Sequence, residues 1–346
     1  MNSLKIATPT VSLLLPLLLL ALTACDSSSD PANVDGGTPS SDSGVNTNDA
    51  NDSDANGGEF DAGNQLPDAT PADPSEFQFV VIPSGVFTMG CLQGRDDVGN
   101  NAAVCGVPAD TVREVTLSRG FSMSKSEVTQ EQFEAIAGFN PSDYSEVACE
   151  SCPVQSMGWN VAAWFTNMLS ADQSLSECYT CTGDPTAIPS TLSCQRPSDP
   201  YACTGFRLPT DAEWEWASRG GESFPYAGAA QPETVSWYER NSESSDFTQP
   251  WIPRKVCTKT ENAYGLCDMT GNVSEWISDT YSSRQTETVT DPVFASGGTT
   301  YRGGYYSLGT TGVQGNRLQI ATSYGIAGSQ NSAGNFIGFR VVRTMP

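Results

Sequence analysis

The folded part of this 346-residue chain is predicted to combine short β-strands with three α-helices and long irregular segments. Alternating apolar residues fill much of the stretch 77–123, and helix-capping signals precede apolar patterns between 129 and 220. Residues 221–346 are rich in Gly, Ser, Thr and Asn, so loops are expected to dominate there. Disulfides and a bound cation are the expected means of holding such loops in place.

The predicted strands come early in the folded part. Residues 77–82 alternate in the manner of a half-buried strand. A turn at 83–85 follows, and 86–90 is predicted to be the return strand. Two more strands are expected at 112–117 and 120–123.

Each of the three helices is recognised by its N-terminal cap. Thr129 with Gln132, and Thr210 with Glu213, form the capping-box pattern, and Asn160 is predicted to cap the helix between them. Glycines that follow the first and third helices are expected to end them. The second helix carries an apolar stripe with the spacing of a core-facing surface, formed by Val161, Trp164, Phe165, Met168 and Leu169.

Charge and histidine content exclude several classes of function. The net charge is −23, and residues 26–76 carry 12 acidic side chains with no Lys or Arg. Such a chain repels phosphate backbones, so nucleic acid is not an expected partner, whereas cations are attracted. The chain contains no histidine. Ser-His-Asp and Cys-His catalysis and metal sites with imidazole ligands are therefore excluded.

The N-terminal segment is predicted to direct export and lipid anchoring. Residues 1–25 have a weakly basic start and an apolar run at 11–22 that is too short to span a bilayer. Leu22-Thr23-Ala24-Cys25 resembles the lipobox of bacterial lipoproteins, in which Cys25 would be lipidated; a plain signal sequence is the alternative. Residues 26–76 have the composition of a disordered acidic tether. The folded domain is predicted at 77–346, on the bacterial cell envelope, with the choice of membrane left open.

The cysteines beyond the signal segment are even in number, which in an exported domain favours disulfides. Two pairs with Cys-x-x-Cys spacing also fit a four-thiolate zinc site, and this alternative stays open. The four cysteines at 178–203 are expected to form two bridges across a long insertion, with their pairing undetermined. The candidates are Cys91, Cys105, Cys149, Cys152, Cys178, Cys181, Cys194, Cys203, Cys257 and Cys267.

Several segments, in this order along the chain, together resemble the sulfatase-modifying-factor and formylglycine-generating-enzyme family. The two most specific are residues 206–217 (FRLPTDAEWEWA) and 262–276 (NAYGLCDMTGNVSEW). The others are 82–90, 127–133, 153–162, 302–304 and 338–341. The resemblance covers about 79–343. It implies a single mixed α+β domain, a variant of the C-type-lectin fold with little regular secondary structure.

Active members of this family oxidise a substrate cysteine with two cysteines that bind copper(I) shortly after the Arg-Gly-Gly motif. Aligned from Arg302, these positions fall on Leu308 and Val313, and residues 305–319 contain no Cys, His or Met. Aliphatic side chains cannot replace thiolates as ligands of a soft ion, so copper chemistry is not expected. Cys257 and Cys267 are expected to bridge each other instead. The family's iron-dependent relatives need histidine ligands, which this chain lacks.

The resemblance also implies a structural calcium site. Its ligands would be the carboxylates of Asp268 and Glu275 and the main-chain carbonyls of Gly271 and Val273, which suit calcium's preference for oxygen. The alternative is that both carboxylates only hydrogen-bond nearby main chain. The chain is too altered at a second site of the family to predict it there, at Asn241 and Asp246.

Two further groups of residues lie within the matching motifs. Charged side chains are expected to form buried ion pairs that organise the loops, namely Arg207, Glu213, Arg302 and Arg340. Three tyrosines lie where the family's substrate groove is, and they would form either a recognition surface or core packing: Tyr301, Tyr305 and Tyr306.

Three functions are compatible with these observations. The favoured one is a non-catalytic, membrane-anchored binding or scaffold module whose ligand is an unidentified protein, peptide or glycan. The second is a formylglycine-generating oxidase that uses other cysteines. The third is a purely structural envelope lipoprotein.

Overall fold

The computed structural model describes residues 76–92, 94–96, 112–143, 149–187, 190–244, 251–281, 287–294, 297–310, 318–326 and 330–345. For the strand at 323–326 it describes the main chain alone. All of them belong to one compact unit, Leu66–Pro346. Five parts of the sequence on which predictions were made lie outside the described residues: the signal segment with Cys25, the tether up to residue 75, Cys105, Asp246 and Val313. Among the helices that are described, none is long and apolar enough to cross a membrane.

The described secondary structure is mixed, as predicted. The α-helices are α1 (Gln130–Ala137), α2 (Trp159–Asp172) and α3 (Asp211–Arg219), and two 3-10 turns lie at Pro200–Ala202 and Pro232–Thr234. The strands of the first half are β1 (Phe79–Ile82), β2 (Gly85–Met89), β3 (Arg113–Leu117), β4 (Phe121–Ser124), β5 (Thr180–Thr182), β6 (Ser193–Gln195) and β7 (Phe206–Arg207). Those of the second half are β8 (Ser236–Trp237), β9 (Thr270–Gly271), β10 (Ser274–Tyr281), β11 (Val289–Thr290), β12 (Gly298–Arg302), β13 (Ser323–Ile326), β14 (Ile337–Phe339) and β15 (Val342–Thr344).

The early strands form where the sequence predicts them, but the predicted hairpin between β1 and β2 is wrong. β1 pairs with β4 in the sheet β1-β4-β15-β7, whereas β2 pairs with β3 in the sheet β11-β3-β2. The turn at 83–85 therefore leads the chain from one sheet to another and does not close a hairpin. Trp216 of α3 packs against Gly85 at the start of β2 and donates from its indole N–H to the carbonyl of Pro83, 2.8 Å away.

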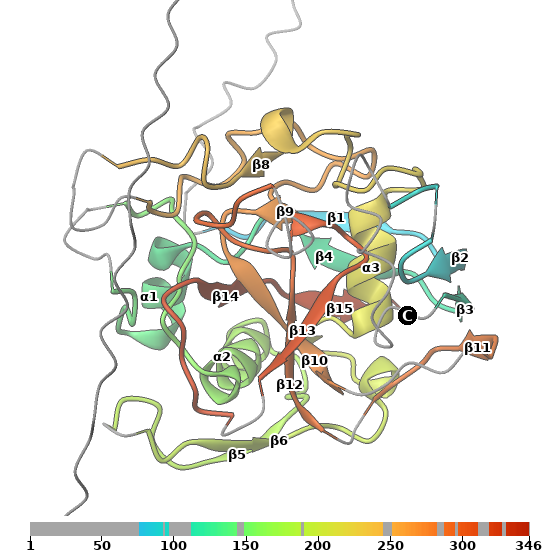
Figure 1. The fold of residues 1–346 in the computed structure, drawn as a ribbon. Coiled ribbons are helices and arrows are strands. Elements are labelled where there is room, and N and C mark those ends of the chain that lie inside the picture. Colours follow the sequence, from blue (N-terminus) through green and yellow to red (C-terminus); the bar gives the residue numbers. More distant parts are fainter. Residues whose placement is uncertain are drawn as a thin grey trace, which may run out of the picture. The chain divides into compact units, whose positions relative to one another are not determined.

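The central sheet, β13-β12-β10-β14, comes from the part of the chain where loops were expected to dominate. Seven of the eight residues of β10 are buried, so this strand lacks the alternation by which a half-exposed strand is recognised. In Figure 1, β10 and β12 cross the middle of the domain, with α3 on one side and α1 and α2 on the other. The sheet therefore gives the two halves of the domain a shared interior.

The helix caps follow the sequence at two of three positions. Thr129 and Thr210 both form complete capping boxes, and both helices end at a glycine in the left-handed conformation. Helix α2 begins earlier than predicted, with Gly158 as its N-cap, so the prediction for Asn160 is wrong. Asn160 lies within the first turn of the helix, and its side-chain amide bonds the main chain of residues outside the helix. It donates to the carbonyl of Leu192 at 2.9 Å and accepts from the N–H of Cys194 at 3.1 Å.

The core has two large parts, one on each side of the central sheet. One gathers aromatic side chains of α1 and α2, where Phe133 stacks on Phe165 with ring centroids 4.8 Å apart. The other packs α3 against β2, β3 and β4 around Trp214. Both parts meet at β10, because Trp276 belongs to the first and Ile277 to the second.

Candidate functional site

A network of buried ion pairs joins α3 to the central sheet, as the sequence predicts. Arg207 and Glu213 form a bidentate pair with both distances at 2.7 Å, and both side chains are almost wholly buried. Arg302, at the end of β12, bonds Asp211 at 2.6 Å and Glu215 at 2.9 Å. Asp211, Glu213 and Glu215 lie two residues apart along α3. Each of them is bonded inside the domain by an arginine from another element.

The second part of this network of ion pairs surrounds Glu275 on β10. Both of its carboxylate oxygens accept from Arg340, at 2.7 Å each, and one also accepts from the indole N–H of Trp214 at 2.7 Å. Arg340 also donates to the carbonyl of Cys267 at 3.0 Å. Glu275 and Arg340 have no exposed side-chain surface. The arginine therefore fixes the motif around Cys267 to the C-terminal strands.

Negative charge exceeds positive charge around this pair. Glu127 is fully buried and accepts from the N–H of Val273 at 3.2 Å. Burial, and then the carboxylates of Asp268 and Glu275, raise the pKa of Glu127 well above its usual range. Burial also raises the pKa of Asp268 to about 6. Three buried carboxylates thus share Arg340 as the cation that acts on all of them.

Asp268 has one carboxylate oxygen in use and one without a partner. Its Oδ2 accepts from the N–H of Cys257 at 2.6 Å, whereas its buried Oδ1 has no hydrogen-bond partner. An acceptor of this kind is costly to bury and suits a cation. The main chain curls at this point, because Asp268, Gly271 and Asn272 all have positive φ. In the described part of the chain, no three acidic or cysteine side chains converge as a metal site by themselves. A cation here would need main-chain carbonyls as well.

Sequence reasoning missed a further buried carboxylate, Asp279, on the same strand as Glu275. It accepts from the N–H of Asp211 at 2.7 Å and from that of Phe294 at 2.6 Å. Burial, and then the charge of Asp211, raise the pKa of Asp279 to about 7. No motif marks this residue, and its role depends on loops that meet only in the folded chain.

At the first copper position of the family, the side chain is a core residue. Leu308 is 2% exposed and packs in a small apolar cluster. The other buried members of that cluster are Tyr226, Val235, Tyr238 and Leu318. Among the described residues, the neighbours of Leu308 in this cluster are aliphatic and aromatic side chains, and none of them is a sulfur ligand for a soft metal.

The three tyrosines of the predicted groove divide between surface and core. Tyr306 is buried, and its hydroxyl donates to the carbonyl of Asn335 at 3.4 Å. Tyr305 is half-buried and stacks on Phe336 with centroids 4.2 Å apart. Tyr301 is also half-buried and packs edge-on against Phe336 and Trp276. Tyr301, Tyr305 and Phe336 therefore form a partly exposed aromatic cluster, and Tyr306 lies beneath it.

Disulfides, and not zinc, account for the described cysteines. The pairs are Cys149–Cys152, Cys178–Cys203, Cys181–Cys194 and Cys257–Cys267, and Cys91 is disulfide-bonded as well. The two bridges expected across the insertion are present, and so is the bridge between Cys257 and Cys267. Because Cys178 and Cys181 bind different partners, the two Cys-x-x-Cys motifs do not form a shared thiolate site.

The fold and the site define a single disulfide-linked α+β domain, organised by buried arginine–carboxylate pairs. The chain matches the family described as sulfatase-modifying factor enzyme 1-like domain over residues 64–345, and it belongs to that family.

Similar proteins in this family differ in their printed functions. The chaperone protein LppX of Paenibacillus barcinonensis is 32% identical over 208 residues, which are 54% of this chain and 71% of that protein. The formylglycine-generating enzyme of Mycobacterium tuberculosis is 38% identical over 79 residues, 21% of this chain and 26% of the enzyme. The inactive C-alpha-formylglycine-generating enzyme 2 of Mus musculus is 34% identical over 86 residues, 23% of this chain and 28% of that protein. The chain thus spans about a quarter of the length of the last two.

Solved structures share the fold over most of the domain. Treponema denticola variable protein 1 superposes with a TM-score of 0.61 at 27% identity, covering 77% of this chain and 95% of that one. PvdO from Pseudomonas aeruginosa superposes with a TM-score of 0.54 at 18% identity, and the match covers 78% of this chain and 95% of the PvdO chain. The second likeness concerns the fold alone.

Proposed function

We propose that this chain is an exported, lipid-anchored member of the family that has lost copper chemistry and binds polypeptides on the cell envelope. The observation that carries the proposal is Leu308. A buried aliphatic side chain in an apolar cluster occupies the position at which copper(I) would need a thiolate. A relative named as inactive and another named as a chaperone support a role in binding.

The partly exposed aromatic cluster, Tyr301, Tyr305 and Phe336, is the surface we propose for binding. Tyrosine and phenylalanine offer large contact areas at a small cost in conformational entropy. The cluster rests on Trp276 of the central sheet, through the edge-on contact of Tyr301 at 5.8 Å. We propose that the cluster presents its rings to an extended chain. The name of the Paenibacillus relative is our reason for choosing a polypeptide over a glycan.

The test is suppression of aggregation of a reduced, unfolding client such as α-lactalbumin, followed by light scattering. We expect the purified chain to suppress scattering near equimolar amounts and Tyr305→Ala to lose most of the effect. Tyr281→Ala is the matched control, because Tyr281 is 41% exposed at the end of β10 and outside the cluster. Equal activity of both variants, or no saturable effect of the unmodified chain, would refute the proposal.

Lipid anchoring is proposed through Cys25. Expression of the full chain with a labelled fatty acid should yield a labelled, membrane-bound protein. Cys25→Ser should be unlabelled and recovered outside the membrane fraction. Labelling that persists in Cys25→Ser would contradict the anchor.

A structural calcium ion is proposed at Asp268, with Glu275 and the carbonyls of Gly271 and Val273. The unpartnered Oδ1 of Asp268 and the excess of buried carboxylates support a cation there. Glu275 would bind only through lone pairs that Arg340 and Trp214 leave available. With Kd about 0.1–1 mM, typical of extracellular sites, 10 mM calcium would stabilise the fold by about 1–3 kcal/mol.

Thermal unfolding with EGTA or calcium checks this proposal. We expect the unfolding temperature to rise by about 3–10 °C in 10 mM calcium. Asp268→Asn should abolish the rise, and Glu114→Gln, an exposed carboxylate on β3, should keep it. A response to magnesium equal to that with calcium would argue for charge screening only.

A further inference from the structure

The Cys149–Cys152 bridge contributes less to the stability of the fold than the other described disulfides. It joins cysteines three positions apart, whereas the other bridges between described residues span separations of 10, 13 and 25. The stabilisation that a cross-link gives by restricting the unfolded chain decreases as the closed loop becomes shorter. A bridge over three positions is therefore expected to add little to the free energy of unfolding.

The main chain holds this loop without help from the disulfide. All four carbonyls of residues 149–152 accept a main-chain N–H. The donors are Cys152 itself to the carbonyl of Cys149 (2.8 Å), Glu131 to Glu150 (3.1 Å), Val256 to Ser151 (3.0 Å) and Gln130 to Cys152 (2.9 Å). Two of these donors belong to the first turn of α1. Opening the sulfur–sulfur bond would leave all four hydrogen bonds in place, so both thiols would stay side by side and ready to close again.

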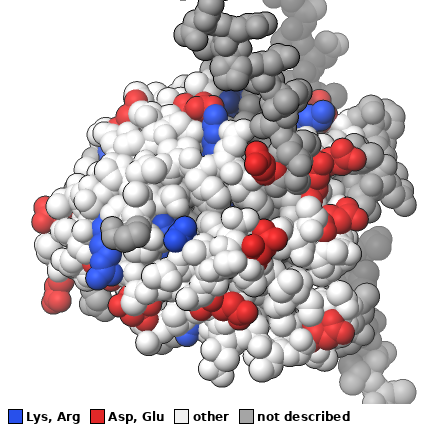
Figure 2. Space-filling model, turned by 180° about the vertical axis from the view of Figure 1, so that it is seen from behind, with Lys and Arg blue, Asp and Glu red and all other residues white. Residues whose placement is uncertain are grey.

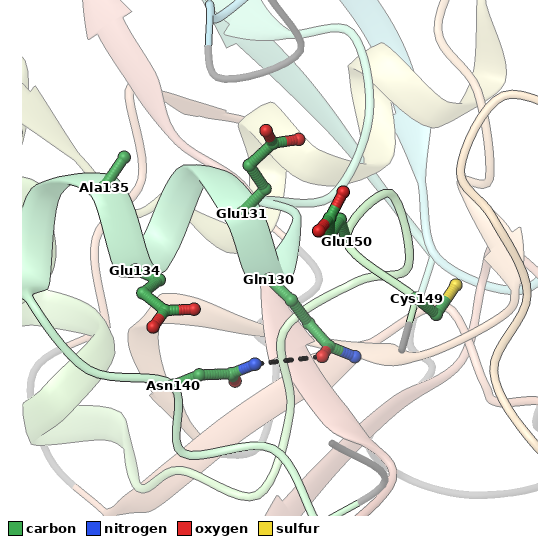
Figure 3. Close-up of a pocket in the computed structure, with 7 residues that line it drawn as sticks. All are labelled: Gln130, Glu131, Glu134, Ala135, Asn140, Cys149 and Glu150. Carbon is green, nitrogen blue, oxygen red and sulfur yellow. Dashed lines mark hydrogen bonds between the residues drawn. The ribbon is translucent and has the colours of Figure 1, made fainter. Parts of the chain in front are cut away.

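The two cysteine residues differ in their exposure to solvent. Cys152 is 3% exposed, whereas Cys149 is half-buried and lines a pocket of about 520 Å³. Figure 3 shows Cys149 at the edge of this pocket, beside Glu150. A molecule in the pocket can approach Cys149, while Cys152 is shielded. This arrangement allows attack at one sulfur and departure of the other.

The negative charge of the pocket favours the binding of cationic molecules. Three carboxylates line it, from Glu131 and Glu134 on α1 and from Glu150 in the loop, and no Lys or Arg is found among the described residues that line it. Figure 3 shows Glu131 and Glu134 on the same helix, and Gln130 bonded to Asn140 below them. Figure 2 shows acidic side chains scattered over one face of the domain, with a few Lys and Arg among them. The net charge of −23 attracts cations to the protein, and this pocket would place them next to a disulfide.

We propose that Cys149–Cys152 is a redox-active disulfide that exchanges with thiols carried on positively charged molecules. A thiolate in the pocket attacks Cys149 Sγ and forms a mixed disulfide. The Cys149–Cys152 bond breaks, and its electron pair leaves on Cys152, which takes a proton from solvent. A second substrate thiol attacks the substrate sulfur of the mixed disulfide and releases Cys149 as a thiol. Two substrate thiols become one disulfide, and the pair gains two electrons and two protons.

Return to the oxidised form is the reverse exchange with an external disulfide. The proposal does not depend on polypeptide binding by the aromatic cluster or on calcium. Either could fail while the exchange reaction is observed, and the reverse also holds.

The experiment measures which bridge of the purified, fully oxidised chain opens first, and with which thiol. The chain is incubated with cysteamine, 2-mercaptoethanesulfonate, or the blocked peptides Lys-Cys-Lys and Glu-Cys-Glu, each at equal thiolate concentration. Samples are quenched with an alkylating agent, and peptide mapping identifies every modified cysteine. The arms also distinguish a small thiol from a thiol on a basic polypeptide.

We expect Cys149 to carry the first mixed disulfide and Cys152 to be alkylated first. At low ionic strength the cationic thiols should react about tenfold faster than the anionic ones, because carboxylates attract one and repel the other. The ratio should approach unity in 0.5 M salt and in Glu131→Gln/Glu134→Gln. The matched control Glu114→Gln, which does not line the pocket, should keep the full preference.

Two results would overturn the proposal. One is opening of Cys257–Cys267 before Cys149–Cys152, since Cys257 is itself exposed. The other is reaction at Cys149 without any preference for cationic thiols. Cys149→Ser/Cys152→Ser serves as a folding check, and it should keep the circular dichroism spectrum and stay within about 3 °C of the unfolding temperature, because the hydrogen bonds hold the loop.

Discussion

Replacing Arg340 with Met should destabilise the domain more strongly than the loss of any surface charge. The guanidinium is fully buried, bonds both oxygens of Glu275 and donates to the carbonyl of Cys267. Its removal would leave Glu275 uncompensated beside Glu127 and Asp268. Breaking a buried ion pair in this way costs about 3–5 kcal/mol.

For a domain of this size, such a loss lowers the unfolding temperature by about 10 °C. Calorimetry of Arg340→Met against the unmodified chain measures it. The matched control is Lys125→Met, which removes a cation from a pair with Glu261 whose side chains are 29% and 44% exposed. Exposed pairs contribute about 0–1 kcal/mol, so this control should shift by no more than about 3 °C.

The result that would refute the reasoning is an equal shift in the two variants. It would mean that Glu275 finds another partner or takes up a proton at no measurable cost. Glu275→Gln/Arg340→Met separates these effects, because it removes both charges together. We expect the double variant to be more stable than Arg340→Met alone.

Three further predictions concern single sites. Asp279 has a pKa raised from 3.8 to about 7, so its contribution to stability is full below pH 4 and is lost as the pH rises through 7. Asp279→Asn should therefore flatten the fall in unfolding free energy between about pH 4 and pH 7, as measured by urea titration. Gly271→Ala should be poorly folded in solubility and circular dichroism assays, because φ is +78° and an added Cβ would meet the Ser236 hydroxyl and the Trp237 carbonyl oxygen. Leu308→Ala should lower the unfolding free energy by about 2–5 kcal/mol through a cavity, and a loss below 1 kcal/mol in urea titration would contradict the core position of this side chain.

The elements that the sequence predicts well are those with local signals. The capping boxes at Thr129 and Thr210 act within one turn of helix, and both are present. The strand partners of β1 and β2 are β4 and β3, which lie about 30 to 40 residues further along the chain, and local alternation carries no information about which strands pair. Helix α2 begins before Asn160, and the side-chain amide of Asn160 bonds the insertion at Leu192 and Cys194, contacts that a local capping pattern does not reveal.

The candidate site shows the same division. The motif residues Arg207, Glu213, Arg302 and Arg340 indicate buried ion pairs, but the sequence does not say which residue pairs with which. Glu127 and Asp279 were not singled out as site residues, because a single carboxylate in a strand or loop looks like a solvated side chain. Their raised pKa values arise from burial by segments that meet only in three dimensions. The pairing of Cys178 with Cys203 and of Cys181 with Cys194 was undetermined for the same reason.

The proposed loss of copper chemistry is tested most directly by anaerobic titration of the oxidised, purified chain with copper(I) against a competing chelator, followed by oxygen uptake with a cysteine-containing peptide. The apolar setting of Leu308 predicts that the chelator keeps the metal at every ratio and that the peptide causes no oxygen uptake above the rate of free copper. Binding of one copper(I) per chain, with oxygen consumed in proportion to peptide aldehyde formed, would contradict the account.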